Sequence, residues 1–143
     1  MRFAFAFGSL AALAATAAAA PAPQAATDSQ YGSWALNYTW NSAANGWKQE
    51  KFEAVYSVDG SSASQIYTYS PWLEGAEKET TVSDPASFVG SYNGSYVFLQ
   101  QTVVIENTNV TIYGNAPLET SCKSPTGRLC KGSATVEVTQ AVA

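Results

Sequence analysis

Hydrophobic and polar residues alternate along most of the chain after residue 30. The apolar members of four such runs are Trp34, Leu36, Tyr38 and Trp40; Phe52, Ala54, Tyr56 and Val58; Val110 and Ile112; and Ala134, Val136 and Val138. A period of two is typical of a strand that buries one face. Beyond residue 30, no segment keeps the i, i+3, i+4, i+7 spacing of an amphipathic helix over three turns. The pattern therefore predicts an all-β protein.

The run Tyr96–Ile105 is the longest apolar stretch in this part of the chain. It places large side chains at two successive positions, Phe98 and Leu99, and so is apolar on both faces. Strands that are covered on both sides have this composition. We therefore expect residues 96–105 to form a central strand.

Turn residues separate the runs. Three pairs supply the positive φ that tight hairpins need, namely Asn45-Gly46, Asp59-Gly60 and Asn93-Gly94. The last pair joins residues 87–92 to residues 95–105 in a hairpin. Ser70-Pro71 and Asp84-Pro85 break the chain elsewhere. Several strands at this spacing predict a single-domain antiparallel β-barrel or sandwich.

The N-terminus has a different composition. A positive start at Arg2 precedes an apolar run that ends in small residues near Ala20, as in a signal peptide. We predict a signal peptide at residues 1–19, a disordered lead-in or pro-segment at 20–29 and the folded domain at 30–142. A membrane anchor is the alternative, which the weak hydrophobicity of alanine and the lack of a following Lys/Arg cluster disfavour. The protein should thus be secreted and extracellular, with no membrane association after signal removal.

Charge and composition exclude several functions. The 143 residues include seven basic and eleven acidic ones, for a net charge of −4, which disfavours nucleic acid as a partner. The sequence has no histidine, which removes Ser-His-Asp and Cys-His nucleophiles and the common zinc sites. We therefore predict no catalytic residue, no metal and no cofactor.

A carboxylate pair is the remaining option for catalysis. On a strand, Glu77 and Glu79 would share a face about 7 Å apart, within the range of inverting glycosidases. Lys78 and Thr80 lie around them, so a solvated acidic turn is the simpler interpretation. A small glycosidase is therefore the weakest of the functional hypotheses.

The cysteines and the glycosylation sequons agree with export. Cys122 and Cys130 close a nine-residue loop, and in an exported protein such a pair predicts a disulfide. A metal site is the alternative, but there is no histidine to complete it. Asn-x-Ser/Thr sequons begin at Asn37, Asn93 and Asn109, at positions expected to face solvent. We predict N-glycosylation there if the source is eukaryotic.

Aromatic residues make up 13% of the chain and equal the charged residues. Most should belong to the core of a small β domain. Trp47 and Trp72 lie next to turn residues and are expected to be partly exposed. Aromatic rings bind sugars and flat aromatic ligands by stacking, so these two tryptophans are the predicted binding residues.

Several segments resemble a known family. Residues 31–34 read Tyr-Gly-Ser-Trp, residues 42–47 read Ser-Ala-Ala-Asn-Gly-Trp, and an alternating strand follows to Tyr56. Near the end, Cys122 and Cys130 flank a short polar loop before Gly132 and a final alternating strand. These features resemble the fungal secreted Alt a 1-like proteins, also called AA1-like domains. The resemblance covers nearly the whole mature chain.

The resemblance implies a compact β-barrel, secretion, frequent dimerisation and no enzyme activity. Better-known members carry further cysteines, including one that links the dimer, and these are absent here. We therefore expect a monomer or a weak non-covalent dimer. The expected function is that of an effector, elicitor or allergen-like protein that binds a host protein or a small aromatic or carbohydrate ligand. The alternative is a carbohydrate-binding or cell-wall surface module that uses exposed aromatics.

Overall fold

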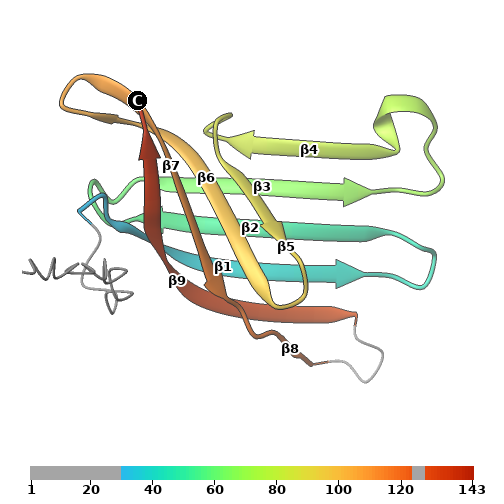
Figure 1. The fold of residues 1–143 in the computed structure, drawn as a ribbon. Coiled ribbons are helices and arrows are strands. Elements are labelled where there is room, and N and C mark those ends of the chain that lie inside the picture. Colours follow the sequence, from blue (N-terminus) through green and yellow to red (C-terminus); the bar gives the residue numbers. More distant parts are fainter. Residues whose placement is uncertain (1–29, 124–127) are drawn as a thin grey trace, which may run out of the picture.

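A computed structural model describes residues 30–123 and 128–143. The predicted signal peptide and lead-in therefore lie outside the described residues. The described chain contains nine β-strands and one short 3-10 helix, η1 (Figure 1). In chain order they are β1 (Ser33–Ser42), β2 (Lys48–Tyr56), β3 (Ser62–Tyr69), η1 (Gly75–Glu77), β4 (Glu79–Asp84), β5 (Val89–Tyr92), β6 (Tyr96–Ile105), β7 (Thr108–Pro117), β8 (Ser121–Cys122) and β9 (Leu129–Val142). The all-β prediction is confirmed.

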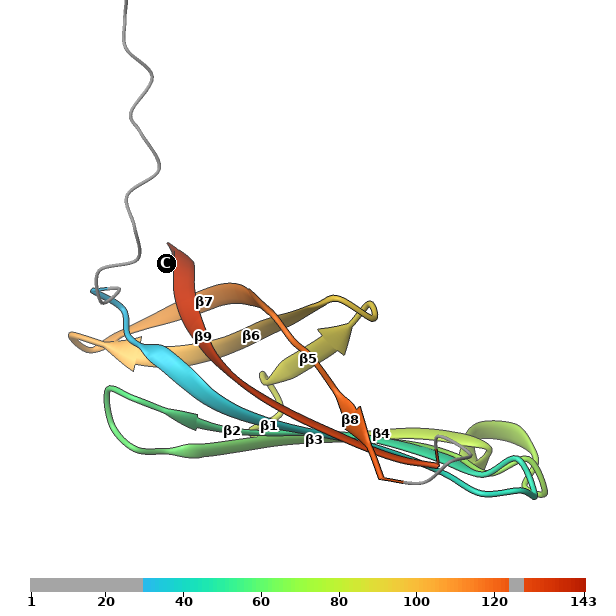
Figure 2. The ribbon, with the colours of Figure 1, turned by 90° about the horizontal axis from the view of Figure 1, so that it is seen from below.

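The strands form one curled antiparallel sheet in the order β4-β3-β2-β1-β9-β7-β6-β5, with β8 added to β9. The long strand β9 pairs with β1 over its first part and with β7 over its last part. Its bend carries the sheet from a first layer, β1–β4, into a second layer, β5–β7 (Figures 1 and 2). Within the described residues β4 and β5 end this order, so the sheet is a half-barrel.

Two glycines allow close approach of backbone and side chains between the layers. A Cβ built at Gly114 would lie 2.3 Å from the carbonyl oxygen of Glu137, beside the register shift in the pairing of β7 with β9. A Cβ built at Gly90 would lie 2.6 Å from Cγ of Phe52. Glycine at these positions is therefore needed for the layers to close on the core.

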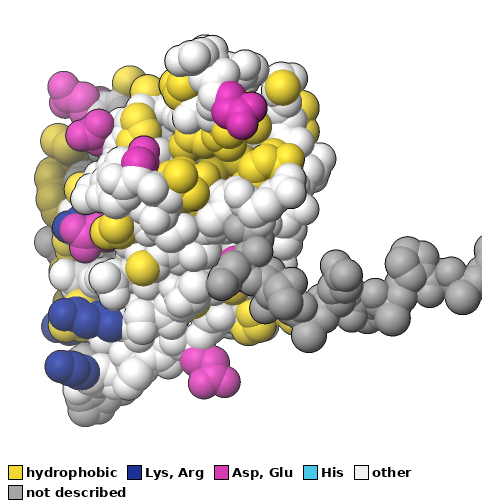
Figure 3. All heavy atoms as spheres, turned by 90° about the vertical axis from the view of Figure 1, so that its left-hand side faces the viewer, with side chains coloured by type: hydrophobic (Ala, Val, Ile, Leu, Met, Phe, Trp, Pro, Cys, Tyr) yellow, Lys and Arg dark blue, Asp and Glu magenta, His cyan; other side chains and the backbone are white. Residues whose placement is uncertain are grey.

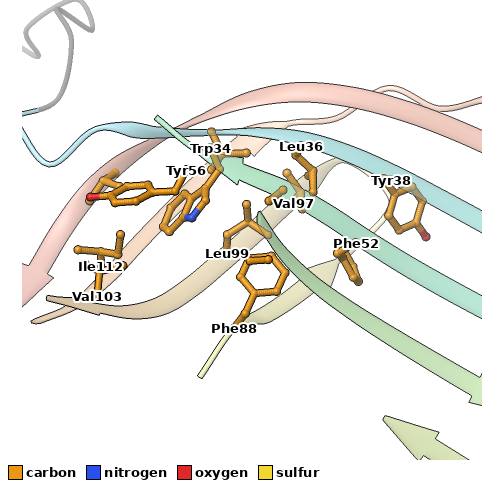
Figure 4. Packing of buried hydrophobic residues seen from close by; sticks show 14 of the residues in the cluster. Trp34, Leu36, Tyr38, Phe52, Tyr56, Phe88, Val97, Leu99, Val103 and Ile112 are labelled. Carbon is orange, nitrogen blue, oxygen red and sulfur yellow. The ribbon is translucent and has the colours of Figure 1, made fainter. Parts of the chain in front are cut away.

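The core fills the space between the two layers (Figure 4). The first layer contributes Trp34, Leu36 and Phe52, and the second layer contributes Leu99 and Ile112, all at most 2% exposed. One polar contact crosses this core, because the indole Nε1 of Trp34 donates to Oε1 of Gln101 at 2.9 Å. Buried polar atoms need such partners.

The alternation pattern is confirmed for most strands, and the three predicted glycine turns have positive φ at Gly46, Gly60 and Gly94. The hairpin around Asn93-Gly94 is also confirmed, with β5 paired to β6. The strand expected around Val110 is longer than predicted, since β7 has 10 residues. Val58 was expected on a strand face, but β2 ends at Tyr56 and Val58 is 64% exposed in the following turn.

The prediction that Tyr96–Ile105 is buried on both faces is wrong. β6 does lie between β5 and β7 in the sheet. Only one of its faces meets the core, however: Leu99 is 2% exposed, whereas Phe98 is 44% exposed. The reason is that β6 belongs to an outer layer of a half-barrel, so its second face points to solvent.

Candidate functional site

The first layer extends past the second. Strands β1–β4 continue beyond β5, the nearest strand of the second layer, toward the end that holds η1 (Figure 2). Tyr38 and Phe52, with ring centroids 5.2 Å apart, are the last large core residues in that direction. Within the described residues, the same side of the sheet then continues without a second layer above it.

We call this uncovered part of the core-facing side the open face. Strand register assigns eight residues to it, two from each strand: Trp40 and Ser42, Lys48 and Glu50, Tyr67 and Tyr69, and Glu79 and Thr81. One row across the strands reads Trp40, Glu50 and Tyr67. The three aromatic residues of the open face are partly buried, while Lys48 and Glu79 are exposed. The open face is therefore a surface of aromatic rings flanked by charges.

Hydrogen bonds hold two carboxylates of this surface in place. The hydroxyl of Tyr67 donates to Oε1 of Glu79 at 3.1 Å. The hydroxyl of Tyr38, at the margin of the core, donates to Oε1 of Glu50 at 2.8 Å. Burial and the hydrogen bond to the neighbouring carboxylate raise the pKa of both tyrosines. Both hydroxyls are therefore protonated donors at neutral pH, and each glutamate has a second oxygen that can accept a further hydrogen bond.

Two lysines lie near the third aromatic ring. Nζ of Lys48 is 5.9 Å and Nζ of Lys78 is 5.7 Å from the centre of the Tyr69 ring, at cation–π distance. The formal charges of these two lysines and of Glu50 and Glu79 sum to zero. The eight residues of the open face include one lysine and two glutamates, for a formal charge of −1, and the neighbouring Lys78 offsets this charge.

The disulfide borders the open face. Cys122 and Cys130 are bonded, as predicted, and their bridge joins β8 to β9. Cys130 is buried and pairs with Trp40 in the register of β1 and β9. The bridge therefore secures the strand edge next to Trp40. Residues 124–127 of the predicted loop lie outside the described residues.

Trp47 and Trp72, the predicted binding residues, occupy turns at this same end of the sheet. Trp72 is 57% exposed and Trp47 is partly buried. The two turns are neighbours, because a Cβ built at Gly46 would lie 3.2 Å from Cγ of Pro71. Both tryptophans therefore stand beside the open face rather than in the row of Trp40 and Tyr67.

Sequence reasoning missed the open face because Trp40 shares the alternation of the core run that starts at Trp34. A signal for it does exist in β2. Positions 48 and 50 fall on the same face as Phe52, yet they hold Lys48 and Glu50. Charged side chains at core-facing positions indicate that the strand has left the core.

The three sequon asparagines are exposed, as expected. Asn37 lies on the side of β1 opposite the open face, and Asn109 is exposed on β7. In the β5–β6 turn, Oδ1 of Asn93 accepts from the backbone N–H groups of Ser95 at 3.0 Å and Tyr96 at 2.8 Å. Glycosylation itself stays a prediction, and Asn37 would carry a glycan away from the open face.

The proposed strand face with two glutamates does not form. Glu77 belongs to η1, and Glu79 is the first residue of β4. The break between them arises because the chain turns at η1 before it enters the strand. Among residues 30–123 and 128–143, no group of three or more His, Cys, Asp and Glu side chains is placed to hold a metal ion.

A second hollow lies at the opposite end of the half-barrel, where hydrophobic side chains reach the surface (Figure 3). It measures about 590 Å³, and its walls include Tyr31, Tyr56, Ile105 and Val110. The hydroxyl of Tyr56 donates to the backbone oxygen of Tyr31, which ties the entry of the chain to this hollow. Gln30, the first described residue, lies on its rim.

Comparisons with known proteins do not add a relative. No family model matches the chain, and neither a curated protein nor a solved structure matches it. In the described part of the chain, no helix is long and apolar enough to cross a membrane. The geometry of the open face is therefore the basis for assigning a function.

Proposed function

We propose that this chain is an exported protein that acts by binding, through its open face, at a host or cell-wall surface. The observation that carries the proposal is that Tyr67 and Tyr69 lie on a sheet face that continues past the second layer, beside Trp40 at the edge of the core. Tryptophan and tyrosine supply large contact area at low conformational cost, and they dominate binding energy where they are desolvated.

The scaffold beneath these rings suits recognition. Four paired strands hold the rings in fixed register, and sites on strands keep their geometry better than sites on loops. The side chains around them offer hydrogen-bond donors and acceptors of both charges. In this proposal the glutamates orient a ligand and do not catalyse a reaction, because each is hydrogen-bonded to a tyrosine beside an open surface.

Two features support an extracellular place of action. The disulfide fits an oxidising compartment, and the N-terminus has the composition of a signal peptide. The resemblance to Alt a 1-like proteins would place the binding event at a plant surface, in the role of an effector or elicitor. A cell-wall surface module is the alternative, and it would use the same rings.

Sedimentation with washed plant cell-wall fragments tests the proposal, because these fragments carry both polysaccharide and protein. The wild type should sediment with the fragments. A Tyr67→Ala/Tyr69→Ala variant should stay in the supernatant, and Thr68→Ala, on the opposite side of the same strand, should sediment like the wild type. Equal sedimentation of all three, or none by the wild type, would contradict binding through the open face.

A further inference from the structure

We infer that the ligand of the open face is a neutral, β-1,4-linked hexopyranose chain that lies across strands β1, β2 and β3. The inference rests on the proposed function and names the class of ligand. It is carried by three properties of the surface: the separation of its rings, the hydrogen-bonding group between them and the balance of its charges.

The spacing of the two aromatic positions comes from strand register. Trp40 pairs with Glu50, and Glu50 pairs with Tyr67, so the two aromatic residues are two strands apart. Neighbouring strands are about 4.8 Å apart, which gives roughly 9.5 Å between the two positions. A β-1,4 linkage turns each sugar over relative to the one before it. Alternate sugars thus present the same face at disaccharide intervals, a length that two strand spacings match.

The group between the rings suits the intervening sugar. Glu50 occupies the strand between Trp40 and Tyr67, and Tyr38 engages only its Oε1 among the described contacts. Its Oε2 can therefore accept a hydrogen bond from a sugar hydroxyl. Glu79 has the same arrangement with Tyr67 at the far edge. A sugar stacked on each ring would thus meet a fixed acceptor beside it.

The charges favour a neutral ligand. Lys48 and Lys78 offset Glu50 and Glu79, and both lysines lie close to one ring, that of Tyr69. A polyanion would meet the two carboxylates, and a polycation would meet the two ammonium groups. Neither has a complementary patch here, whereas a neutral polyol can bond to both kinds of group.

Isothermal titration calorimetry with matched oligosaccharides tests the inference. Chitohexaose and cellohexaose are neutral β-1,4 chains, and the glucosamine hexamer has the chitohexaose backbone with a positive charge on each sugar. We expect binding of at least one neutral hexamer and much weaker binding of the charged one. Tyr67→Ala should weaken binding about thirtyfold, as for an aromatic anchor. Tyr67→Phe should keep most of the affinity because the ring remains, and Thr68→Ala should not change it.

The outcomes separate the ligand class from the proposed function. If wall fragments bind through Tyr67 and Tyr69 but neither neutral hexamer binds or competes, the ligand class is wrong and the binding function stands. Loss of wall binding after protease treatment of the fragments would identify a host protein as the partner and also overturn the inference. Tighter binding of the glucosamine hexamer than of chitohexaose would overturn it as well. If no variant of the open face changes binding to wall fragments, the proposed function itself fails.

Discussion

The two halves of the first layer share strands, register and alternation, yet they differ in what faces them. Toward one end, Trp34, Leu36 and Phe52 lie under the second layer and are at most 2% exposed. Toward the other end, the same side of the sheet holds Trp40, which is partly buried and packs against the edge of the core, and Tyr67. The covered half is the hydrophobic core, and the uncovered half is the open face.

The residue types on the core-facing side of β2 also differ between the covered half and the open face. In β2, the core-facing positions of the covered half hold Phe52, Ala54 and Tyr56, whereas those of the open face hold Lys48 and Glu50. Under the proposed function, rings in the first half stabilise the fold, and Tyr67 and Tyr69 in the second half contact a ligand.

The largest expected effect is on stability, and it should separate the halves. Phe52→Ala removes a ring that is 1% exposed and should lower the free energy of unfolding by about 3–5 kcal/mol. Tyr67→Ala should cost less than about 1 kcal/mol, as is common for surface substitutions. Urea denaturation followed by tryptophan fluorescence measures both. Equal losses would mean that the open face belongs to the core.

Removal of the disulfide should have an intermediate effect. A Cys122→Ser/Cys130→Ser variant loses a bridge worth about 2.5 kcal/mol on the chain-entropy estimate for a nine-residue loop. The protein should stay folded, because the bridge lies at the edge of the open face and the covered core does not depend on it. Denaturation under identical conditions checks this, and complete unfolding at room temperature would show that the core alone is too weak.

Alkaline pH should lower stability through Tyr38, which lies at the border between the covered half and the open face. Burial, followed by the bond to Glu50, raises the pKa of Tyr38 above its usual value near 10. The unfolded chain therefore loses this proton first, so stability present below pH 10 should decline as pH rises above it. Tyr38→Phe should lower stability at pH 7 by about 1 kcal/mol through the lost hydrogen bond. It should also reduce the decline between pH 10 and pH 12, and an unchanged slope would exclude Tyr38 as its source.

The smallest effect concerns the reverse side of the sheet. Asn37 is exposed on the side of β1 that faces away from the open face. In protein from a eukaryotic host, Asn37→Gln should reduce the mass by one glycan and leave unchanged the binding of whichever neutral hexamer the wild type binds. Mass spectrometry and titration together check this prediction. A change in affinity would show that the two sides of the sheet are not independent.

Local pattern predicted much of this fold. A period of two identified β1 and β2 of the first layer but not β3 and β4, and glycine pairs identified the turns at Gly46, Gly60 and Gly94. The disulfide followed from cysteine spacing in an exported chain. These features depend on neighbours in sequence, so the sequence alone was sufficient to predict them.

Which faces of each strand are buried by a second layer could not be predicted in this way. Phe98 and Leu99 look equally buried in sequence, but only Leu99 faces the core, because β6 lies in an outer layer. Trp40 looks like Trp34, but Trp34 is fully buried, whereas Trp40 is partly buried at the edge of the core. Burial on the second face of a sheet depends on pairings between distant strands, such as β9 with β7. Local alternation contains no information about these pairings.

Hydroxyl-radical footprinting with and without the neutral hexamer that binds more tightly tests the central claim most directly, because it reports the solvent exposure of each ring. Without ligand, Tyr67 and Tyr69 should be oxidised, whereas Tyr56, which is 2% exposed, should be protected. With ligand, oxidation of Tyr67 and Tyr69 should fall, and oxidation of Tyr96, 45% exposed on β6, should not change. Protection of Tyr67 in the free protein, or ligand protection at Tyr96 in place of Tyr67, would contradict the assignment of the open face as the binding surface.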